Sequence, residues 1–326
     1  MSPRRRDPLE ERLDRLGDLR EDPDSPATPE ALRAALGDRH NLVAAKAARM
    51  AAELGKDELA SELTAAFDRF LDAEADRGCH AKTAIAKALV ELDHPATRLF
   101  RRGIRVVQME GAYGGPVDVA QELRANCAVG LVNSGHPDAV VELVPLLTDP
   151  GLPVRLAAAQ GIGASGRAEA EAVLRLKALV GDEEPEVITE CLAALLRLAP
   201  ERSLEFVEPF LASGGPFSGA RREAAILALG ESRLEEAVGV LRREWGRSHD
   251  GDSRRTVLLA LVTSRRESAL DFLLSLVAEG EPRPAREALS ALAIHRRDER
   301  IRERVAAAVR ASKHSAELAR HVDREF

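Results

Sequence analysis

The chain has 326 residues, of which 45% are apolar and 31% are charged, a balance that predicts a folded protein rather than a disordered one. Aromatic residues make up only 3%, with one Trp and one Tyr, so an extensive base-stacking platform or aromatic cage is not expected. The net charge of −7 argues against a dominant role in binding nucleic-acid phosphates.

The sequence carries no sign of a membrane or secretory destination. No apolar run is long enough to cross a bilayer, and the basic start at Met1–Arg6 is followed by charged residues instead of the apolar stretch of a secretory signal. Three well-separated cysteines, Cys79, Cys127 and Cys191, fit a reducing compartment without a disulfide framework. We therefore expect a cytoplasmic protein that does not contact a membrane.

Residues 1–28 are rich in charge and contain several prolines. A short charged helix is expected near Pro8–Leu19, within a partly ordered N-terminal tail or cap. The repeating part of the chain starts after this segment.

From residue 29 onward the sequence repeats about every 32 residues. Each copy has a helical segment rich in Ala and Leu, such as Val154–Gly163, preceded by a segment with apolar residues three and four apart, such as Val140, Leu143 and Leu147. One helix pair cannot bury its apolar stripe alone, whereas stacked pairs share a continuous core. No strand-like alternation recurs, so strands are not expected. The residues that align between copies are Ala51, Leu89, Leu131, Ile162, Leu195, Leu229, Leu261 and Leu292.

The clearest copy runs Leu146-Leu-Thr-Asp-Pro-Gly-Leu-Pro-Val-Arg155 and continues with Ala158, Ala159, Ile162 and Gly163. This pattern resembles the HEAT repeat family, including the bacterial HEAT-like repeats named after phycobilisome lyases, and the resemblance covers residues 30–312. It implies an all-α fold, a right-handed α-solenoid (superhelix) of about eight HEAT-like antiparallel helix pairs over residues 29–312. Residues 313–326 are strongly charged and are expected to form a C-terminal capping helix, because a solenoid needs a polar end.

The family typically has an Asp in the turn inside a repeat and an Arg or Lys six positions later. A turn Asp can accept amide N–H bonds at the start of the next helix, and the basic residue can pair with such carboxylates. The matching pairs here are Asp76 and Lys82, Asp118 and Arg124, and Asp149 and Arg155. We expect them to form a structural ladder of charges. Because Asp182 is followed by Ile188, and because Arg222, Arg254 and Arg286 lack the matching Asp, the ladder is expected to weaken toward the C-terminus.

The longest interval between aligned residues, from Leu89 to Leu131, indicates an insertion near residues 98–118. If this segment begins as a helix, Arg98, Arg102 and Arg105 lie near one face with Arg101 beside them, and Tyr113 follows in a Gly-rich loop. An arginine cluster can bind a carboxylate or phosphate through paired hydrogen bonds, and inserted loops often carry function. The competing interpretation is a solvated convex face followed by a connector. These residues are the first candidate partner-binding site.

The second helix of each pair lines the concave face in HEAT-like stacks, so the resemblance also predicts a recognition surface. Outward positions on these helices would carry small residues early in the chain and alternating charges later, which suits a peptide or protein of mixed charge. The competing interpretation is that these positions are solvated and have no partner. The candidate partner-binding residues are Asn126, Thr189, Glu190, Glu223 and Arg255, and the same two registers contain Ala125, Leu156, Glu287, Ala157, Ala224, Thr256 and Ala288.

Motifs for chemistry are missing from the sequence. Cys79–His80 is the only adjacent Cys/His pair, and no second pair follows at zinc-ligand spacing. There is no Gly-x-Ser-x-Gly nucleophile turn, and the glycines of Gly161–Gly166 are expected at a helix C-terminus rather than around a phosphate. The HEAT-type iron hydroxylases use repeated His-Glu dipeptides, of which this chain has none. No catalytic residue, metal or cofactor is expected.

The sequence and the resemblance together predict a non-catalytic scaffold or adaptor that binds another protein or peptide on the concave face of the solenoid. Binding of nucleic acid is not expected, and the oligomeric state stays open. Two alternatives remain: a HEAT-like enzyme of the alkylbase DNA glycosylase or bilin lyase type, and a structural subunit of a larger assembly. The glycosylase alternative would need aromatic residues on a basic face, whereas Trp245 falls on an expected core stripe with Val238 and Leu241.

Overall fold

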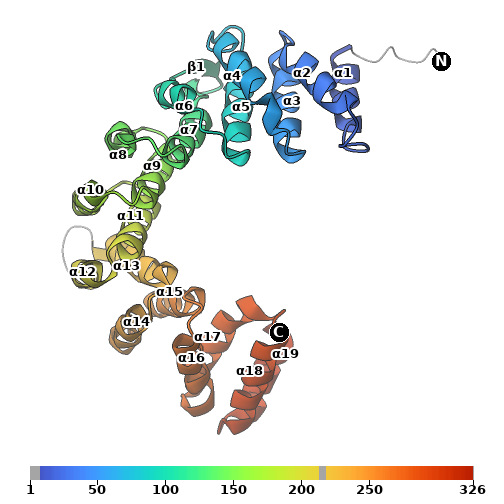
Figure 1. The fold of residues 1–326 in the computed structure, drawn as a ribbon. Coiled ribbons are helices and arrows are strands. Elements are labelled where there is room, and N and C mark those ends of the chain that lie inside the picture. Colours follow the sequence, from blue (N-terminus) through green and yellow to red (C-terminus); the bar gives the residue numbers. More distant parts are fainter. Residues whose placement is uncertain (1–7, 213–217, 326) are drawn as a thin grey trace. The chain divides into compact units, whose positions relative to one another are not determined.

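The structure is a computed structural model that describes residues 8–212 and 218–325, and the chain divides into two units, residues 1–170 and 171–326 (Figure 1). Unit 1 contains α1 (Pro8–Asp18), α2 (Ala27–Leu36), α3 (Asn41–Glu53), η1 (Asp57–Leu59), α4 (Ala60–Arg69), η2 (Arg77–Cys79), α5 (His80–Glu91), α6 (Thr97–Gly103), β1 (Met109–Ala112), β2 (Gly115–Asp118), α7 (Gln121–Asn133), α8 (Ala139–Leu143), η3 (Val144–Thr148) and α9 (Leu152–Ala164). Helix α10 (Ala168–Val180) crosses the boundary. Unit 2 continues with α11 (Pro185–Leu198), α12 (Pro200–Val207), η4 (Glu208–Leu211), α13 (Ser218–Ser232), α14 (Glu235–Arg247), α15 (Gly251–Thr263), α16 (Glu267–Glu279), α17 (Pro282–Leu292), η5 (Ala293–His295), α18 (Glu299–Ala311) and α19 (Ser315–Glu325).

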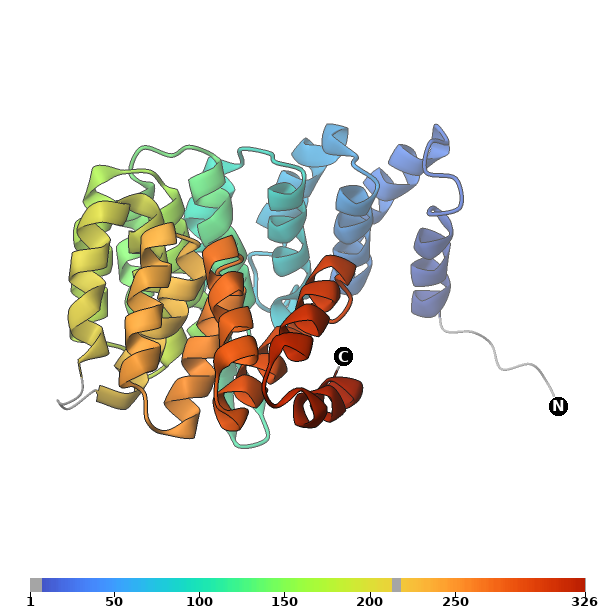
Figure 2. The same ribbon diagram turned by 90° about the horizontal axis from the view of Figure 1, so that it is seen from below.

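Within each unit, alternate helices pack against one another. In unit 1, α3 packs on α5, α5 on α7 and α7 on α9. In unit 2, α11, α13, α15, α17 and α19 form one row, here called the odd row, while α14, α16 and α18 form a second row. Figure 2 shows the yellow and orange helices of unit 2 side by side with roughly aligned axes. Stacked helix pairs of this kind are the architecture of an α-solenoid, so the predicted all-α fold class is confirmed.

Small residues allow the helices of a row to approach closely. Ala158 and Ala159 of α9 and Ala225 of α13 are fully buried, and the single methyl group of Ala takes up little space between stacked helices. Gly130 of α7 shows how tight one such approach is, because a methyl group there would lie 2.5 Å from the ring of Phe100 in α6. The high Ala content of the chain therefore follows from the packing of its rows.

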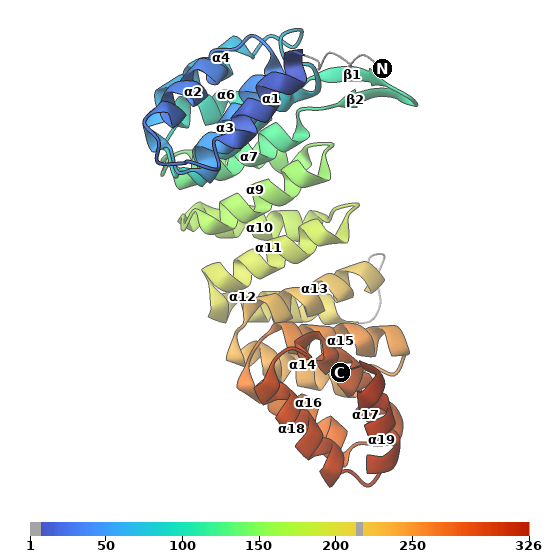
Figure 3. The ribbon, with the colours of Figure 1, turned by 90° about the vertical axis from the view of Figure 1, so that its right-hand side faces the viewer.

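The expectation that the chain has no strands is wrong for the insertion. Strands β1 and β2 form an antiparallel hairpin in which Met109 pairs with Asp118 and Ala112 with Gly115, and Figure 3 shows it extending from the helices of unit 1. Gly114 and Gly115 adopt φ values of 105° and 122° at the turn, a conformation that side chains with a Cβ rarely adopt. The strands are short and mostly exposed, so no alternating apolar face marked them in the sequence.

Both ends of the described chain pack onto the stack. Helix α1 covers most of the expected Pro8–Leu19 helix, buries Leu16 and pairs Arg12 with Asp38 at 2.7 Å; residues 1–7 of the predicted tail lie outside the described residues. Helix α19 packs on α17 and α18 and buries Leu318, while residue 326 is not described. None of the helices in these described ranges is both long and apolar enough to span a bilayer.

Candidate functional site

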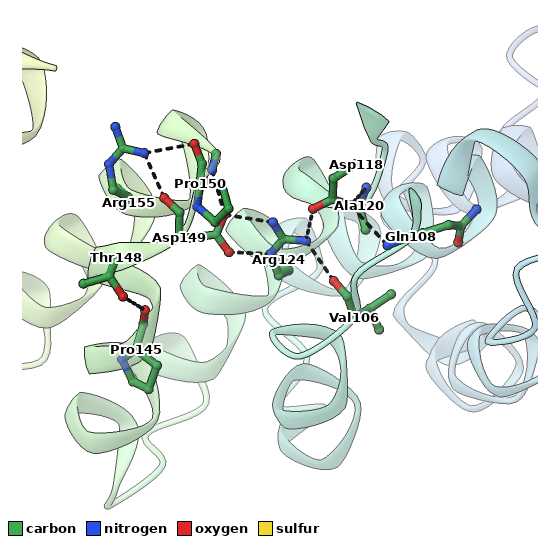
Figure 4. A network of polar contacts seen from close by, with 11 residues as sticks. Val106, Gln108, Asp118, Ala120, Arg124, Pro145, Thr148, Asp149, Pro150 and Arg155 are labelled. Atoms are coloured by element: carbon green, nitrogen blue, oxygen red, sulfur yellow. Dashed lines mark hydrogen bonds and ion pairs between the residues drawn. The ribbon is translucent and has the colours of Figure 1, made fainter. Parts of the chain in front are cut away.

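The charged residues predicted between repeats meet at the turns of unit 1 (Figure 4). Arg124 of α7, only 2% exposed, donates from Nε and Nη2 to the two carboxylate oxygens of Asp149, each at 2.8 Å. Its Nη1 lies 2.7 Å from Asp118 Oδ2 and donates to the carbonyl oxygen of Val106 at 2.9 Å. One buried guanidinium therefore joins the end of β2 to the turn that follows η3 in the next repeat.

Backbone amides hold the same two carboxylates in place. Asp118 Oδ1 accepts from the amides of Ala120 at 3.0 Å and Gln108 at 3.1 Å, and Asp149 Oδ1 accepts from the amide of Gly151 at 2.8 Å. Burial acts to raise the pKa of Asp118, but the amide bonds and the Arg124 guanidinium outweigh it, and the pKa falls below its ordinary value. Asp118 therefore stabilises the fold as a carboxylate.

The lowered pKa of Asp118 predicts acid sensitivity in unit 1. The stabilisation is complete above the unfolded pKa of about 3.9 and is lost as the pH falls through the lower folded pKa. Replacing Asp118 with Asn keeps an oxygen acceptor for the amides but removes the titrating group. We expect Asp118→Asn to be less stable than the parent at about pH 7 and to approach it at about pH 3. Urea unfolding across this pH range measures the difference, and a gap that stays constant with pH would contradict the assignment.

One of the three predicted pairs of unit 1 is buried completely. Asp76 and Lys82 are both 0% exposed and lie 3.2 Å apart, and Lys82 Nζ also donates to the carbonyl oxygen of Phe70 at 2.8 Å. Asp76 accepts from the amides of Ala81 and Lys82 at 2.9 and 3.0 Å and from Asn41 Nδ2 at 3.1 Å. Because Asn41 belongs to α3 and Lys82 to α5, this aspartate also joins neighbouring repeats.

Arg155 also contacts the backbone of the turn that precedes its own helix. Its Nη1 donates to the backbone carbonyl oxygens of Asp149 and Pro150, at 2.8 and 3.1 Å. Arg254 repeats this geometry in unit 2, where its Nε donates to the carbonyl oxygen of Ser248 at 2.9 Å. A basic residue six positions after the turn therefore closes the turn itself, in addition to pairing with carboxylates.

The expected weakening of the ladder does not occur at Arg222. This guanidinium contacts Glu244 Oε1 at 2.8 Å from Nε and 2.5 Å from Nη2, and Glu244 is only 2% exposed. The carboxylate comes from helix α14 instead of a turn, so no Asp spacing marked it. Trp245, expected in the core, is half-buried beside Glu244, and Arg254 stacks over its ring at 5.1 Å. Farther along, the pairs are longer: Arg254 lies 4.0 Å from Glu287, and Arg286 lies 3.2 Å from Glu317.

The arginines predicted to cluster near residue 100 do not form a single group in the structure. Arg101 and Arg105 both pair with Glu142 of α8, whose Oε1 lies 2.6 Å from Arg101 Nη2, whereas Arg102 pairs with Asp68 of α4 at 2.5 Å. Helix α6 ends at Gly103, so Arg105 lies past its end. Three of the four arginines thus meet carboxylates of their own unit, while Arg98 is exposed. Tyr113 is fully exposed between β1 and β2.

The residues predicted for the recognition surface differ in exposure. Glu223 and Arg255 are exposed, Asn126 and Glu190 are half-buried, and Thr189 is buried with its hydroxyl donating to the carbonyl oxygen of Pro185. Asn126 Nδ2 donates to the carbonyl oxygen of its own helix at Glu122, and Arg197 pairs with Glu190 at 2.8 Å. Among the other members of the two registers, Ala157, Ala224 and Ala288 are buried, so these three positions do not face outward.

The described residues contain no metal-ligand cluster, and their cysteines are buried. Within residues 8–212 and 218–325, no group of three His, Cys, Asp or Glu side chains is placed to hold a metal ion. Cys79, Cys127 and Cys191 are buried free thiols. Burial raises the pKa of Cys79 to about 11 and that of Cys191 to about 12, and it also raises the pKa of Cys127. These thiols therefore stay protonated at neutral pH and are not activated nucleophiles.

The odd row of unit 2 ends in a groove between α15, α17 and α19, here called the C-terminal groove, with a volume of about 600 Å³. Its apolar lining comes from Leu258, Leu259, Ala291 and Ile294, and Ile294 is 58% exposed. Among the lining residues, Arg255 was predicted from the sequence as a contact and Glu287 falls in the same register, whereas the others were not predicted. The periodic spacing along α17 is the signal that could have found Arg283 and Ser290, whereas no spacing within one helix could have found His321 and Arg324. The charged and polar lining residues are Arg255, Arg283, Arg286, Glu287, Ser290, His321 and Arg324.

Residues 118–196 match the family model of HEAT repeats, and this segment contains Asp118, Arg124, Asp149 and Arg155. The resemblance to HEAT repeats predicted from the sequence is therefore confirmed. No curated protein matches the chain.

Three solved structures are similar to the chain over most of their lengths. The complex of CpcE and CpcF of phycocyanin lyase from Nostoc sp. PCC7120 has 18% identity and a TM-score of 0.37, covering 93% of this chain and 97% of that chain. An engineered protein has 17% identity and a TM-score of 0.37, covering 97% and 94%. Human deoxyhypusine hydroxylase in complex with glycerol has 21% identity and a TM-score of 0.29, covering 97% and 93%.

Proposed function

We propose that this HEAT-repeat chain is a non-catalytic scaffold that binds another protein through the odd row of unit 2. The C-terminal groove is the observation that carries the proposal, because it combines exposed apolar side chains with a charged border. Exposed apolar surface bordered by polar residues is typical of protein-binding sites. The buried thiols fit a cytoplasmic location, since a reducing compartment keeps cysteines unpaired.

The ladder supports this function by fixing the helices that carry the surface. Arg222 and Glu244 join α13 to α14 through a buried ion pair, and Arg222 Nη1 also donates to Ser253 Oγ of α15 at 2.7 Å. A recognition surface held on rigid helices needs little reordering when a partner binds. Of the contacts predicted from the sequence, Glu223 of α13 and Arg255 of α15 are exposed on helices of the odd row and stay in the proposal as contacts.

Site-specific photo-crosslinking tests the proposal. A photoreactive amino acid replaces Ile294 in the C-terminal groove, and the matched control replaces Val141, an equally apolar residue of α8 that is 66% exposed. We expect the photoreactive residue at position 294 to crosslink a discrete partner protein in cells. Unlabelled parent chain should compete for this crosslink, whereas unlabelled chain that carries Ile294→Glu should not. Crosslinking that is equally strong at both positions, or missing at Ile294, would refute a partner site in the groove.

A further inference from the structure

We propose that the C-terminal groove receives an acidic amphipathic helix of a partner protein, about three turns long. This inference rests on the proposed scaffold function and adds the chemical class of the partner segment. Its support comes from three features of the described residues: the periodic lining of α17, the arginines around the groove, and the helical nature of every wall.

The lining of α17 follows one helical face. Arg283, Glu287 and Ser290 of α17 recur at spacings of four and three, and Ile294 follows four positions later in η5, so together they form one stripe. The stripe covers about three turns, or roughly 16 Å. Leu258 and Leu259 of α15 also belong to the lining and give it an apolar floor. A ligand with one apolar stripe fits this floor.

The border of the groove carries more positive than negative charge. Its lining contains four arginines, Arg255, Arg283, Arg286 and Arg324, against one carboxylate. That carboxylate, Glu287, already accepts from Arg283 at 2.9 Å. Within the described residues, Arg324 has no carboxylate partner, and its Nε donates to a backbone carbonyl oxygen.

The remaining arginine pairs of the groove are open to exchange. Arg255 and Asp252 lie 3.4 Å apart with side chains that are largely exposed, and Arg286 and Glu317 lie 3.2 Å apart with both side chains partly exposed. Exposed pairs of this kind contribute little, about 0–1 kcal/mol, so carboxylates of an incoming ligand can replace them. Acidic side chains on a ligand would therefore meet available guanidinium groups along the border.

The walls of the groove select a helix over an extended segment. All three walls are α-helices, whose backbone N–H and C=O groups already bond within the helix. An extended ligand would find no strand edge to pair with and would leave its own backbone groups unsatisfied. A helix satisfies its backbone internally and offers side chains at matching spacings. The floor is aliphatic, so the groove also lacks the aromatic surface on which nucleic-acid bases stack.

The experiment uses the full chain and a fluorescein-labelled, lactam-bridged helical peptide of about 14 residues, or roughly 21 Å. The peptide carries Leu on one face and Glu on both flanks, and matched peptides carry Gln or Lys in place of Glu. We expect the acidic peptide to bind with a micromolar Kd and the Gln peptide to bind about tenfold more weakly. Equal binding of the Gln peptide, or no binding of the acidic one, would overturn the inference.

A charge reversal locates the binding to the groove. The double variant Arg283→Glu and Arg324→Glu is expected to bind the acidic peptide at least tenfold more weakly than the parent does, and to bind the Lys peptide more tightly. The matched control is Arg243→Glu on α14, whose partner pair with Glu208 is exposed, and it should leave the Kd within about twofold. An unchanged Kd in the double variant, or a duplex DNA bound more tightly than the peptide through the same arginines, would contradict the assignment.

The two proposals fail in different ways. If Ile294 crosslinks a partner but no acidic helix binds, the scaffold function stands and the partner segment belongs to another class. If the peptide binds as expected but Ile294 crosslinks nothing, the groove chemistry is right and the scaffold function is wrong. Matched thermal unfolding of each variant and the parent ensures that a lost affinity reflects the groove and not the fold.

Discussion

Replacing Arg124 with Met is expected to destabilise unit 1 by about 3–5 kcal/mol. The change keeps most of the apolar stem but removes the guanidinium that contacts Asp149 at 2.8 Å twice and Asp118 at 2.7 Å. Both carboxylates would then stay mostly buried without their counter-charge. Removing one partner of a buried ion pair costs more than the pair itself contributes, because the remaining charge is left poorly solvated.

The matched control is Arg102→Met in the same unit. Arg102 contacts Asp68 at 2.5 Å, but the two side chains are 43% and 54% exposed, so solvent screens the pair and its loss should cost less than about 1 kcal/mol. Urea unfolding of unit 1 compares the two variants, and hydrogen exchange of the α7 and α9 amides locates the effect. Equal losses of unfolding free energy in the two variants would show that the burial of the Arg124 network adds nothing to stability.

A triple variant separates the missing guanidinium from the stranded carboxylates. Adding Asp118→Asn and Asp149→Asn to Arg124→Met removes both negative charges, while the amide oxygens of Asn can still accept from the amides of Ala120 and Gly151. We expect the triple variant to regain at least about half of the lost stability, since neighbouring residues in one network are not additive. A further loss of stability in the triple variant would mean that the carboxylates stabilise the turns independently of Arg124.

The parts of the fold that could be predicted from the sequence depend on short-range spacing. Apolar residues three and four apart mark the helices because such residues share one helical face. The pairing of Asp149 with the amide of Gly151 is equally local, because the turn and the helix start adjoin in the chain. A repeat of about 32 residues then predicts stacking, since each copy lacks the surface to bury its own stripe.

The parts that could not be predicted depend on contacts between distant segments. Glu142 neutralises Arg101 from a different repeat, and no spacing within the arginine segment reveals it. Ala157 is buried because a helix inside a stack has neighbours on both sides, which leaves a narrower outward stripe than one helix alone suggests. The hairpin escaped prediction because its base is fixed by polar contacts, such as Gln108 Nε2 donating to the carbonyl oxygen of Asp76 at 2.8 Å.

The C-terminal groove escaped prediction for a related reason. Arg255, Arg283 and Arg324 come from three different helices, and only the stacking register brings them to one border. The sequence shows each arginine on its own helix as an ordinary solvated residue. A recognition surface on a repeat protein is therefore a property of the stack, while each repeat alone supplies only part of it.

Replacing Gly230 with Ala is expected to destabilise the contact between α13 and α15. A methyl group at Gly230 would lie 2.5 Å from the carbonyl oxygen and 2.7 Å from the Cα of Ala260. Both neighbours are backbone atoms, which cannot rotate away as a flexible side chain can, so the two helices must separate. Overpacking of this kind costs about 1–3 kcal/mol, which outweighs the gain of about 1 kcal/mol that Ala normally brings to a helix interior.

The opposite sign is expected for Gly246→Ala in α14, because no atom lies within 4 Å of a methyl group there. This control has the same chemical change in the same unit, so any difference between the variants reflects the approach of α13 to α15. Hydrogen-exchange mass spectrometry should show faster exchange in α13 and α15 for Gly230→Ala and no such change for Gly246→Ala. Gly246→Ala should raise the urea midpoint. If Gly230→Ala also raised it, the result would contradict the close approach of α13 to α15. It would equally contradict the register that brings Arg222 of α13 to Ser253 of α15.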